Sequence, residues 1–590
     1  MGKACGAAPH HANAGRAVDV RGRAPQPETM AVTDPVPPPA LLPGRTGALA
    51  PLNHPVFRAV WIMSLVTNFG GLIQSVGASW MMSSIASTQM VALVQASITL
   101  PIMLLSLLAG AMADTVDRRR MMLAAQSFML LVSLTLAIVT GFGLITPWLL
   151  LTFTFLIGCG TAFNGPAWQA SVGDMVPRRD LAGAVTLNSM GFNLARSVGP
   201  AIGGLIVAAA GAAAAFAVNA VSYIGLIVVI FRWKPERAPG TLAREGLIHA
   251  MGAGVRYAAM SPRLYSVLLR AVMFGVGASA VQALMPLVAR HGMGGGGPLV
   301  FGLLLGAFGV GAVGGAIFSG RLRARFATET LVRLTCVAFA GGAVAVGLSP
   351  WLVLTLPALM IAGAAWVLTL STFNVTVQMS VPRWVVARAL ALYQMCAFGG
   401  MALGSWVWGT VAEGHGVAVA LCVSAVVQIV CALTGLKLPL PAADDLNLDP
   451  LSRWTEPQIA VAIEPRSGPV VIEIEYVIDE ADIPAFLAAM AERRRIRRRD
   501  GARHWTLARD LGDPRLWIER YHTPTWTDYV RHNQRITHDD ARITEAIRHL
   551  HHGVERPRVH RMIERSTSVV GEHPDIREMP EPLTDATRAS

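Results

Sequence analysis

The stretch GAMADTVDRRR at residues 110–120 decides the fold, because it joins two long apolar runs. It ends in three arginines, and arginines in a short loop between membrane helices hold that loop on the cytoplasmic side. Gly110 would let two helices approach closely where they leave the bilayer. Asp114 places a carboxylate near a helix end, where it can pair across a gap. Any tight loop between membrane helices can share this composition, so the flanking runs must support the prediction.

Apolar runs long enough to cross a bilayer, about 20 residues each, recur from Val56 to residue 437. Six of them lie before a polar segment at 232–263, and six lie after it. The sequence therefore predicts an all-α membrane protein with twelve transmembrane helices in two six-helix halves. We place the spans at 57–82, 90–113, 121–143, 147–171, 185–208, 211–231, 265–289, 298–320, 331–348, 351–373, 387–411 and 417–437.

Lys and Arg are unequally distributed between alternate loops. One set of loops is rich in arginine, as at 118–120, 178–179 and 321–325, whereas the alternate loops contain no Lys or Arg apart from Arg290. Because basic loops stay inside, we expect a multi-pass inner-membrane protein with both termini in the cytoplasm. Such loops also explain much of the net charge of +12, so this charge does not predict nucleic-acid binding.

The composition changes outside the apolar region and predicts the domain organisation. Residues 1–54 are rich in Ala, Gly, Pro and Arg and lack the apolar run of a signal peptide, so we expect a disordered cytoplasmic arm. The six cysteines show no CxxC spacing, and we predict no disulfide framework, no metal site and no cofactor. The expected division is the arm at 1–54, an N-terminal half at 55–232, a cytoplasmic central loop at 233–263, a C-terminal half at 264–437, a linker at 438–468, a soluble domain at 469–566 and a disordered tail at 567–590.

The two halves also repeat one another. VPRRDLAGAVTLNSMGF at 176–192 resembles VPRWVVARALALYQMCAF at 381–398, with Val-Pro-Arg, a leucine and a methionine at one constant offset. Both copies lie on the predicted cytoplasmic side and lead into the fifth span of their half. A parallel repeat of this kind is typical of transporters whose substrate site lies at the midplane between the halves.

Taken together, these features resemble the major facilitator superfamily. The loop motif between the second and third helices of that superfamily is matched at Gly110, Ala113, Asp114, Arg118 and Arg119. Thr115 and Asp117 depart from it. The ending Asp-Arg-Arg-Arg is similar to a branch of bacterial exporters that includes the enterobactin exporter, of the transmembrane secretion effector type. The sequence Gly-Pro-x-x-Gly-Gly at 199–204 resembles part of a motif of drug–proton antiporters, although Ala195 departs from its upstream part.

The resemblance implies a secondary active transporter rather than an enzyme. It would export a small organic molecule, siderophore-like or drug-like, across the inner membrane by alternating access, with proton antiport. Gly110, Asp114, Arg118 and Arg119 would form a gating motif in which Asp114 pairs near the start of the eleventh helix, around Arg388. A carboxylate is favoured at a positive helix end by about 0.3–1 kcal/mol. The motif does not give the direction of transport, so import stays an alternative.

Polar residues within the spans are candidates for the substrate path, because burying them in lipid is costly. Arg196 lies about half-way along the fifth span, and we interpret it as a partner for an anionic group of the substrate or as a gating residue. The alternative is an arginine that snorkels or satisfies backbone carbonyls. Arg270 lies closer to a span end, which favours a structural role. No Asp or Glu lies in mid-span, so the relay residue for a proton is not identified. The other candidates are Asn68, Gln74, Asn164, Asn193, Gly199, Pro200, Gln282, Asn374, Gln378 and Gln394.

Residues 469–566 have the hydrophobic period of a small α+β domain. VVIEIEYVI at 470–478 alternates like a half-buried strand, and Gly-Asp-Pro at 512–514 indicates a turn. The order βαββαβ predicts a ferredoxin-like domain, which resembles the modules of cofactor-independent monooxygenases. Strands are expected at 470–478, 504–509, 516–521 and 559–563, and helices at 483–499 and 527–550.

This soluble domain has two interpretations. An interaction or dimerisation module is favoured, because no metal-spaced cluster or nucleophile–base pair is evident. The alternative is a membrane-tethered enzyme or sensor whose activity lies in this domain. The arginine run Arg493–Arg499 is either a solvated helix face or a contact with anionic lipid headgroups, and nucleic acid is not predicted because no aromatic residues are interleaved. Residues that could line an enzyme pocket are His504, Trp505, His522, His532 and His538.

Overall fold

The computed structural model describes residues 49–177, 180–234, 247–292, 297–382, 384–441, 457, 459–461 and 463–564. Most of the predicted N-terminal arm, much of the predicted linker and the predicted C-terminal tail lie outside these residues. Arg178 and Arg179, which contribute to the predicted orientation, also lie outside them.

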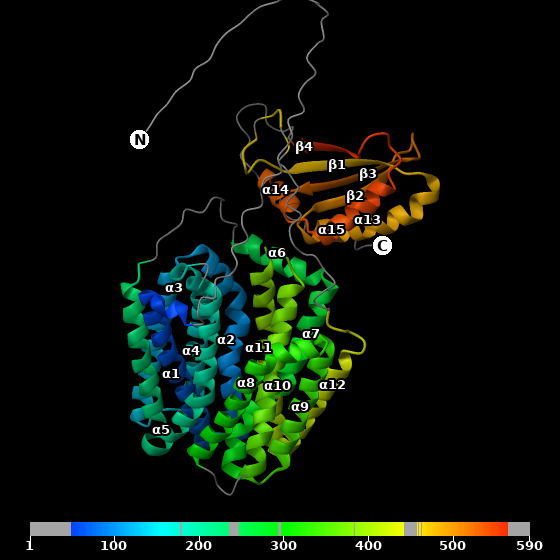
Figure 1. The fold of residues 1–590 in the computed structure, drawn as a ribbon. Coiled ribbons are helices and arrows are strands. Elements are labelled where there is room, and N and C mark those ends of the chain that lie inside the picture. Colours follow the sequence, from blue (N-terminus) through cyan, green and yellow to red (C-terminus); the bar gives the residue numbers. More distant parts are fainter. Residues whose placement is uncertain are drawn as a thin grey trace, which may run out of the picture. The chain divides into compact units, whose positions relative to one another are not determined.

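Eleven helices of the described chain are long and apolar enough to cross a membrane, and they form one bundle (Figure 1). One of them, α5, covers two of the predicted spans. The two spans are separate helices, because the backbone at Gly211 (φ 80, ψ 175) is not helical. The predicted helical membrane fold is therefore confirmed. The bundle helices are α1 (Pro55–Ile85), α2 (Thr88–Thr115), α3 (Arg118–Gly141), α4 (Pro147–Met175), α5 (Leu181–Arg232), α7 (Pro262–Leu287), α8 (Pro298–Arg325), α9 (Thr328–Leu348), α10 (Leu352–Met379), α11 (Val386–His415) and α12 (Val417–Thr434).

Helix contacts divide the bundle into two halves that repeat the same pairings. In the first half, α1 and α3 pack on α5, and α2 packs on α4. In the second half, α7 packs on α11, α9 on α12 and α8 on α10. The halves meet where α2 packs against α11 and where α5 packs against α8. Any site at the midplane is therefore bordered by these four helices.

The contact between α5 and α8 depends on glycine. A Cβ atom at Gly204 would lie 2.6 Å from the carbonyl oxygen of Pro298, and one at Gly302 would lie 2.7 Å from that of Pro200. Further along, a Cβ atom at Gly309 would lie 2.5 Å from the carbonyl oxygen of Arg196. Real Cβ atoms do not approach backbone oxygens so closely, so only glycine lets these two helices meet at this distance.

The central segment contains a helix that the sequence analysis did not predict. We expected a polar loop at 233–263, whereas α6 spans Leu247–Ala259 and packs against α2, α7 and α11. Tyr257 and Ala258 are buried. A helix of this length is marginal by itself, so tertiary contacts rather than local propensity stabilise it.

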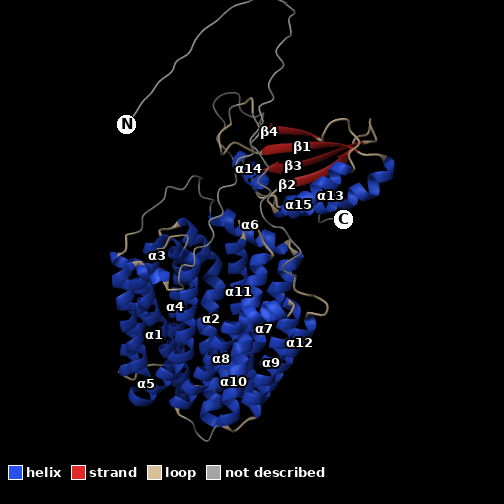
Figure 2. Cartoon of the chain, viewed as in Figure 1, coloured by secondary structure: helices blue, strands red, loops and turns tan. Residues whose placement is uncertain are grey.

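The C-terminal region forms one antiparallel sheet of four strands in the order β2-β3-β1-β4 (Figure 2). The sheet contains β1 (Val470–Val477), β2 (Arg503–Arg509), β3 (Leu516–Thr523) and β4 (Arg558–Ile563). The helices are α13 (Ile483–Arg499), α14 (Trp526–Gln534) and α15 (His538–His549). The predicted strands and first helix are found close to their expected positions.

The second predicted helix of this region, at 527–550, is instead two helices. Thr537 interrupts it, because its hydroxyl accepts a hydrogen bond from the backbone N–H of Asp540 at 3.2 Å. The Asp540 carboxylate in turn accepts from the backbone N–H of Thr537 at 3.3 Å, which completes a capping box. A strong helix start therefore ends the preceding helix early.

One face of the sheet packs on these helices. Ile472, Ile474 and Tyr476 alternate along β1 and are buried with Phe486 and Met490 of α13. The alternation that predicted a half-buried strand therefore faces this core.

Candidate substrate site and gates

Arg196 lies where the two halves of the bundle meet. Its guanidinium carbon is 5.6 Å from the ring centroid of Phe308 on α8 and 5.5 Å from that of Trp366 on α10. The side chain is half-buried. No hydrogen bond or ion pair joins its guanidinium to any residue that the structure describes. The first half thus contributes a cation, and the second half contributes the two rings that face it.

The two rings belong to an aromatic cluster in the second half. Trp366 lies 5.8 Å from Phe274 on α7, 6.1 Å from Phe308 and 6.4 Å from Phe339 on α9, measured between ring centroids. Phe274 and Phe339 are fully buried. The cluster fixes Trp366 in place, because neighbouring rings on three helices confine it.

Asn164 and Gln282 each hold a buried polar atom without a partner. Within the described chain, neither Oδ1 of Asn164 nor Nε2 of Gln282 has a hydrogen bond. Leaving such an atom unsatisfied costs about 1–3 kcal/mol. Both residues, on α4 and α7, therefore stay candidates for contacts with a substrate or with water.

Gln74 lies in a buried network within the first half. Its side-chain oxygen accepts a hydrogen bond from the Ser133 hydroxyl at 3.1 Å and another from the amide of Asn219. Asn219 also donates to the Tyr223 hydroxyl at 3.2 Å. In this structure Gln74 is therefore used for helix packing rather than for a substrate path.

The remaining predicted path residues occupy several environments. The Asn193 amide donates to the Ser189 carbonyl of its own helix at 2.8 Å. The Gln378 amide donates to Asn374 at 2.6 Å. A Cβ atom at Gly199 would lie 3.1 Å from Cβ of Leu72, so this glycine serves the packing of α5 on α1. The others also lie in bundle helices, namely Asn68 on α1, Pro200 on α5 and Gln394 on α11.

One end of the bundle, which we call the Arg290 end, is closed by contacts between the halves. Arg290 donates to the backbone carbonyl of Ser83 and, at 3.3 Å, to its hydroxyl. The Glu413 carboxylate accepts from the backbone N–H of Gln89 at 3.0 Å. Nearby, the Trp80 and Phe301 rings stack with centroids 6.3 Å apart. Of these residues only Arg290 had a signal in the sequence, because it is the exception to the pattern of arginine-free loops.

The arginines of the predicted gating motif bind within the first half. Arg118 donates to the Asp174 carboxylate and to the Ala170 carbonyl, each at 3.0 Å. Arg119 donates to the carbonyl of Ile230 at 3.1 Å and also to that of Phe231. These bonds tie the start of α3 to the ends of α4 and α5, at the opposite end of the bundle, which we call the Arg118 end.

The other two predicted residues of the gating motif are Asp114 and Gly110. The side chain of Asp114 lies outside the described residues, so its pairing near Arg388 stays a prediction. A Cβ atom at Gly110 would meet no atom within 4 Å. The close helix approach expected at Gly110 is therefore absent in this structure, because no described neighbour lies against that face of α2.

Arg270 is fully buried but paired. Its guanidinium donates to the Glu329 carboxylate at 2.6 Å, and Glu329 also accepts from Arg333 at 2.8 Å. This ion pair joins α7 to α9. The structure thus agrees with the structural role that the sequence favoured for Arg270.

In the C-terminal domain, Glu519 is fully buried among donors. Its carboxylate accepts from Arg493 at 2.8 Å, from Trp505 at 3.0 Å and from the Tyr476 hydroxyl at 2.9 Å. Arg497 lies at 3.4 Å. Burial works against the charged form, but the two arginines outweigh it and lower the pKa of Glu519 to about 2. The cluster is a satisfied core network.

The residues predicted to line an enzyme pocket are spread over this domain. Trp505 binds Glu519, and the buried His532 contacts Arg497 at 2.7 Å. The His504 and His522 rings meet edge to face with centroids 5.5 Å apart. Burial and the Arg497 charge lower the pKa of His532 well below its ordinary value. Over the described ranges, no group of three or more His, Cys, Asp or Glu side chains could hold a metal ion.

The arginine run of α13 is only partly exposed. Arg493, Arg497 and Arg499 are buried, and Arg499 pairs with Asp500 and Asp540, each at 2.9 Å. The predicted solvated face is therefore wrong for these three, because α13 turns Arg493 and Arg497 towards the buried Glu519 and Tyr257 of α6 lies against Arg499.

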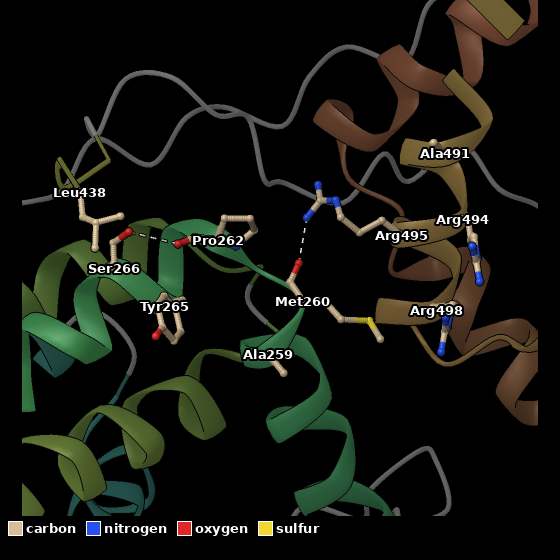
Figure 3. A pocket seen from close by; sticks show the side chains of 10 residues that line it. All are labelled: Ala259, Met260, Pro262, Tyr265, Ser266, Leu438, Ala491, Arg494, Arg495 and Arg498. Carbon is tan, nitrogen blue, oxygen red and sulfur yellow. Dashed lines mark hydrogen bonds between the residues drawn. The ribbon is translucent and has the colours of Figure 1, made fainter. Parts of the chain in front are cut away.

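The other arginines of the run face a hollow beside α6 and α7. The Arg495 guanidinium donates to the Met260 carbonyl at 2.9 Å (Figure 3). This bond joins the C-terminal domain to the central segment. The hollow is lined by Ala259, Met260, Pro262, Tyr265, Ser266, Leu438, Ala491, Arg494, Arg495 and Arg498.

The repeated halves, the apolar helices and the polar residues between the halves define a multi-pass membrane transporter of the major facilitator type. The chain belongs to the family described as transmembrane secretion effector, whose model matches residues 46–568. Two curated relatives are also transporters. The staphyloferrin A transporter of Staphylococcus aureus is 29% identical over 185 residues, which are 31% of this chain and 47% of that protein. The match thus spans about half the length of that relative.

The second relative and the solved structures extend the likeness over more of the bundle. The uncharacterized MFS-type transporter YfiS of Bacillus subtilis is 25% identical over 364 residues, which are 60% of this chain and 85% of that protein. The nucleoside transporter NupG has a TM-score of 0.53 at 14% identity, covering 65% of this chain and 98% of that one. A bacterial homolog of the human lysosomal transporter Spinster, inward-facing and unoccupied, has a TM-score of 0.52 at 14% identity, covering 64% and 95%. At these identities the structures support the fold alone.

Proposed function

We propose that this protein exports a small organic molecule across the cell membrane by alternating access. The observation that supports this most directly is Arg196, an intramembrane cation placed between the halves beside aromatic rings and without a partner among the described residues. The family description and the staphyloferrin A transporter add support for a siderophore-like substrate, and a drug-like one is the second choice. Membership of the enterobactin exporter branch and proton antiport are part of the proposal and rest on the motif resemblance.

The orientation follows from the arginine-rich loops. We place the Arg118 end and both termini in the cytoplasm. The Arg290 end is then external. The contacts of Arg290 with Ser83 and of Glu413 with Gln89 would form an outer gate, which must open to release the substrate.

The gating motif would stabilise the opposite state. Asp114 would pair near Arg388 at the start of α11 when the outer gate is open, and Arg118 and Arg119 would hold the loop rigid through their bonds to α4 and α5. A latch of this kind only needs to bias a bistable element. In this role the motif sets the balance between the two states rather than binding the substrate.

The C-terminal domain, which we place at 469–566 with a ferredoxin-like fold, would serve interaction or dimerisation. The surface arginines Arg494, Arg495 and Arg498 are the members of the run that could still contact anionic lipid. Catalysis is not part of the proposal, because no observation among the described residues favours it.

Accumulation of dyes and antibiotics in cells that express the full chain tests the export proposal. We expect lower accumulation than in cells without the chain, and we expect a protonophore or Asp114→Asn to abolish the difference. Protein level and membrane insertion of the variant are the controls. Normal export by Asp114→Asn would remove the latch, and export that is indifferent to the protonophore would remove proton antiport.

Unchanged accumulation of every compound would restrict the proposal to a narrow substrate. Uptake driven by the chain, seen as higher accumulation, would overturn the export direction. Deleting 469–590 separates the roles of the two regions, because a transporter should then retain part of its export.

A further inference from the structure

Three other arginines of the bundle helices and their ends each have an acceptor. Arg270 donates to Glu329 at 2.6 Å, Arg290 donates to Ser83, and Arg323 donates to the Ser371 hydroxyl at 2.7 Å. Arg196 has no such acceptor among the described residues. A guanidinium stays charged at any physiological pH, and even a half-buried charge is stabilised when an anion pairs with it. The position is therefore incomplete without an anion.

The aromatic contacts of Arg196 do not complete it. Cation–π contacts with Phe308 and Trp366 use only the positive charge of the guanidinium. They leave the five N–H donors of the guanidinium without acceptors. A carboxylate matches this donor fork, because two parallel N–H···O bonds can form at once.

The surroundings also indicate what the anion is attached to. Phe308 and Trp366 belong to a cluster with Phe274 and Phe339. Phe308 and Trp366 are buried in this structure, and aromatic groups pair favourably with such rings at centroid distances of about 4.5–7 Å.

We propose that Arg196 binds a carboxylate group of the transported molecule and that Phe308 and Trp366 contact its apolar or aromatic part. The substrate class is therefore an organic carboxylate. This inference rests on the proposed export function and specifies the substrate of the same site. Because the carboxylate binds a residue of α5 and the body contacts α8 and α10, the molecule bridges the two halves.

Equilibrium binding to the purified full-length chain in lipid nanodiscs tests the proposal. The probes are three acid–amide pairs, namely benzoate and benzamide, 2-naphthoate and 2-naphthamide, and indole-3-acetate and indole-3-acetamide, measured by calorimetry. Each pair keeps the ring and removes the charge. We expect the acid with the larger ring to bind best, and each bound acid to exceed its amide by roughly tenfold to a hundredfold, the range expected of hydrogen bonds to a charged group.

Variants assign this preference to one side chain. Arg196→Gln should abolish the preference for the acid, and Arg196→Lys should restore part of it. Arg323→Gln is the matched control, since it removes one arginine charge from the bundle without touching either ring, and it should leave the preference unchanged. Gel filtration of each variant verifies folding, and the wild-type comparison of acid with amide does not depend on any variant.

Three outcomes would overturn the proposal: no acid binds to the wild-type chain, acids and amides bind alike, or Arg196→Gln keeps the preference. Dye export measured in parallel distinguishes this inference from the proposed function. Export without acid preference would reject the carboxylate and keep the transporter. Acid preference without any export would do the reverse.

Discussion

The membrane bundle and the C-terminal domain both bury arginine, and they do so in opposite ways. In the domain, Arg493 and Arg497 share the carboxylate of Glu519 at 2.8 and 3.4 Å. In the bundle, Arg196 lies beside two rings and has no carboxylate within the described chain. An arginine that stabilises the fold has its carboxylate partner within the same chain. A cation without one indicates that the anion arrives from outside.

Arg270 and Arg290 show that this difference is not simply one of membrane against water. Arg270 lies in a bundle helix and still has Glu329. Arg290 uses the carbonyl of Ser83. The role of each of these arginines is therefore indicated by whether the chain supplies an acceptor, and not by whether the arginine lies in the membrane or in water. The following predictions test that distinction.

The largest effect is expected from removing the anion of the C-terminal domain. Glu519→Gln leaves Arg493 and Arg497 buried without a carboxylate and should destabilise the domain by about 3–5 kcal/mol. Glu473→Gln is the matched control, because Glu473 pairs with the half-exposed Arg520 at 3.2 Å and such pairs contribute about 0–1 kcal/mol. Hydrogen exchange of β3 in the full-length protein measures both, and equal effects would reject the special role of Glu519.

The next effect compares the two intramembrane arginines. Arg270→Gln should lower the stability of the bundle by about 1–3 kcal/mol, because it removes a buried, charge-assisted hydrogen bond. Arg196→Gln should lower the stability less than Arg270→Gln does, since it removes two cation–π contacts but no charge-assisted hydrogen bond. Thermal unfolding of the purified variants measures this difference. An equal loss in Arg196→Gln would make Arg196 a structural residue and would break the comparison.

Acid should weaken the C-terminal domain. The pKa of His532 is lowered well below 6.5 by burial and by Arg497, so the unfolded chain takes up this proton first. Stability is then fully present above about pH 6.5 and falls as the pH is lowered towards the folded pKa. The lowered pKa of Glu519 adds a second loss, between its ordinary value of 4.5 and about 2.

His532→Gln tests the first of these losses. It removes the titration and should flatten the pH dependence of β3 exchange between pH 6.5 and 5, whereas Glu473→Gln should not. An unchanged slope in the His532 variant would assign the acid sensitivity to another group.

The smallest effect concerns the arginine that uses a carbonyl. Arg290→Ala should weaken the outer gate by about 1 kcal/mol, the value of one hydrogen bond, which is roughly a fivefold shift between states. A cysteine placed at the buried Ser197 reports this shift through its reaction with an impermeant maleimide added to intact cells. Arg263→Ala removes an exposed arginine near the other end and is the control. Equal labelling in both variants would remove Arg290 from the gate.

The fold was largely predictable from the sequence, because hydrophobic length and alternation act locally. The spans, the strands and the helix at 483–499 follow from residues that are close in sequence. The helix α6 could not be predicted in this way, since tertiary contacts stabilise it. The break before α15 comes from the capping box of Thr537 and Asp540, which lies inside the region predicted as one helix at 527–550.

The candidate site was predictable only in part. Arg196 could be found because a charge in mid-span is rare. Phe308 and Trp366 could not, because aromatic residues are common in spans and their contact with Arg196 depends on how the halves pack. Burial of Arg493 and Arg497 could likewise not be predicted, since their acceptor Glu519 lies 26 and 22 residues further along the chain.

Gly211 has a consequence for what a cell displays. It reverses the chain between the two spans of α5 within a single residue. If the Arg290 end is external, as proposed, three connections of the first half face the outside of the cell. They are the turn at Gly211, Ala86 and Ser87 between α1 and α2, and residues 142–146 between α3 and α4. An antibody or a phage would find almost no surface to recognise there. An epitope tag intended for surface detection therefore belongs at 142–146, because an insertion at Gly211 would separate two helices that have no slack between them.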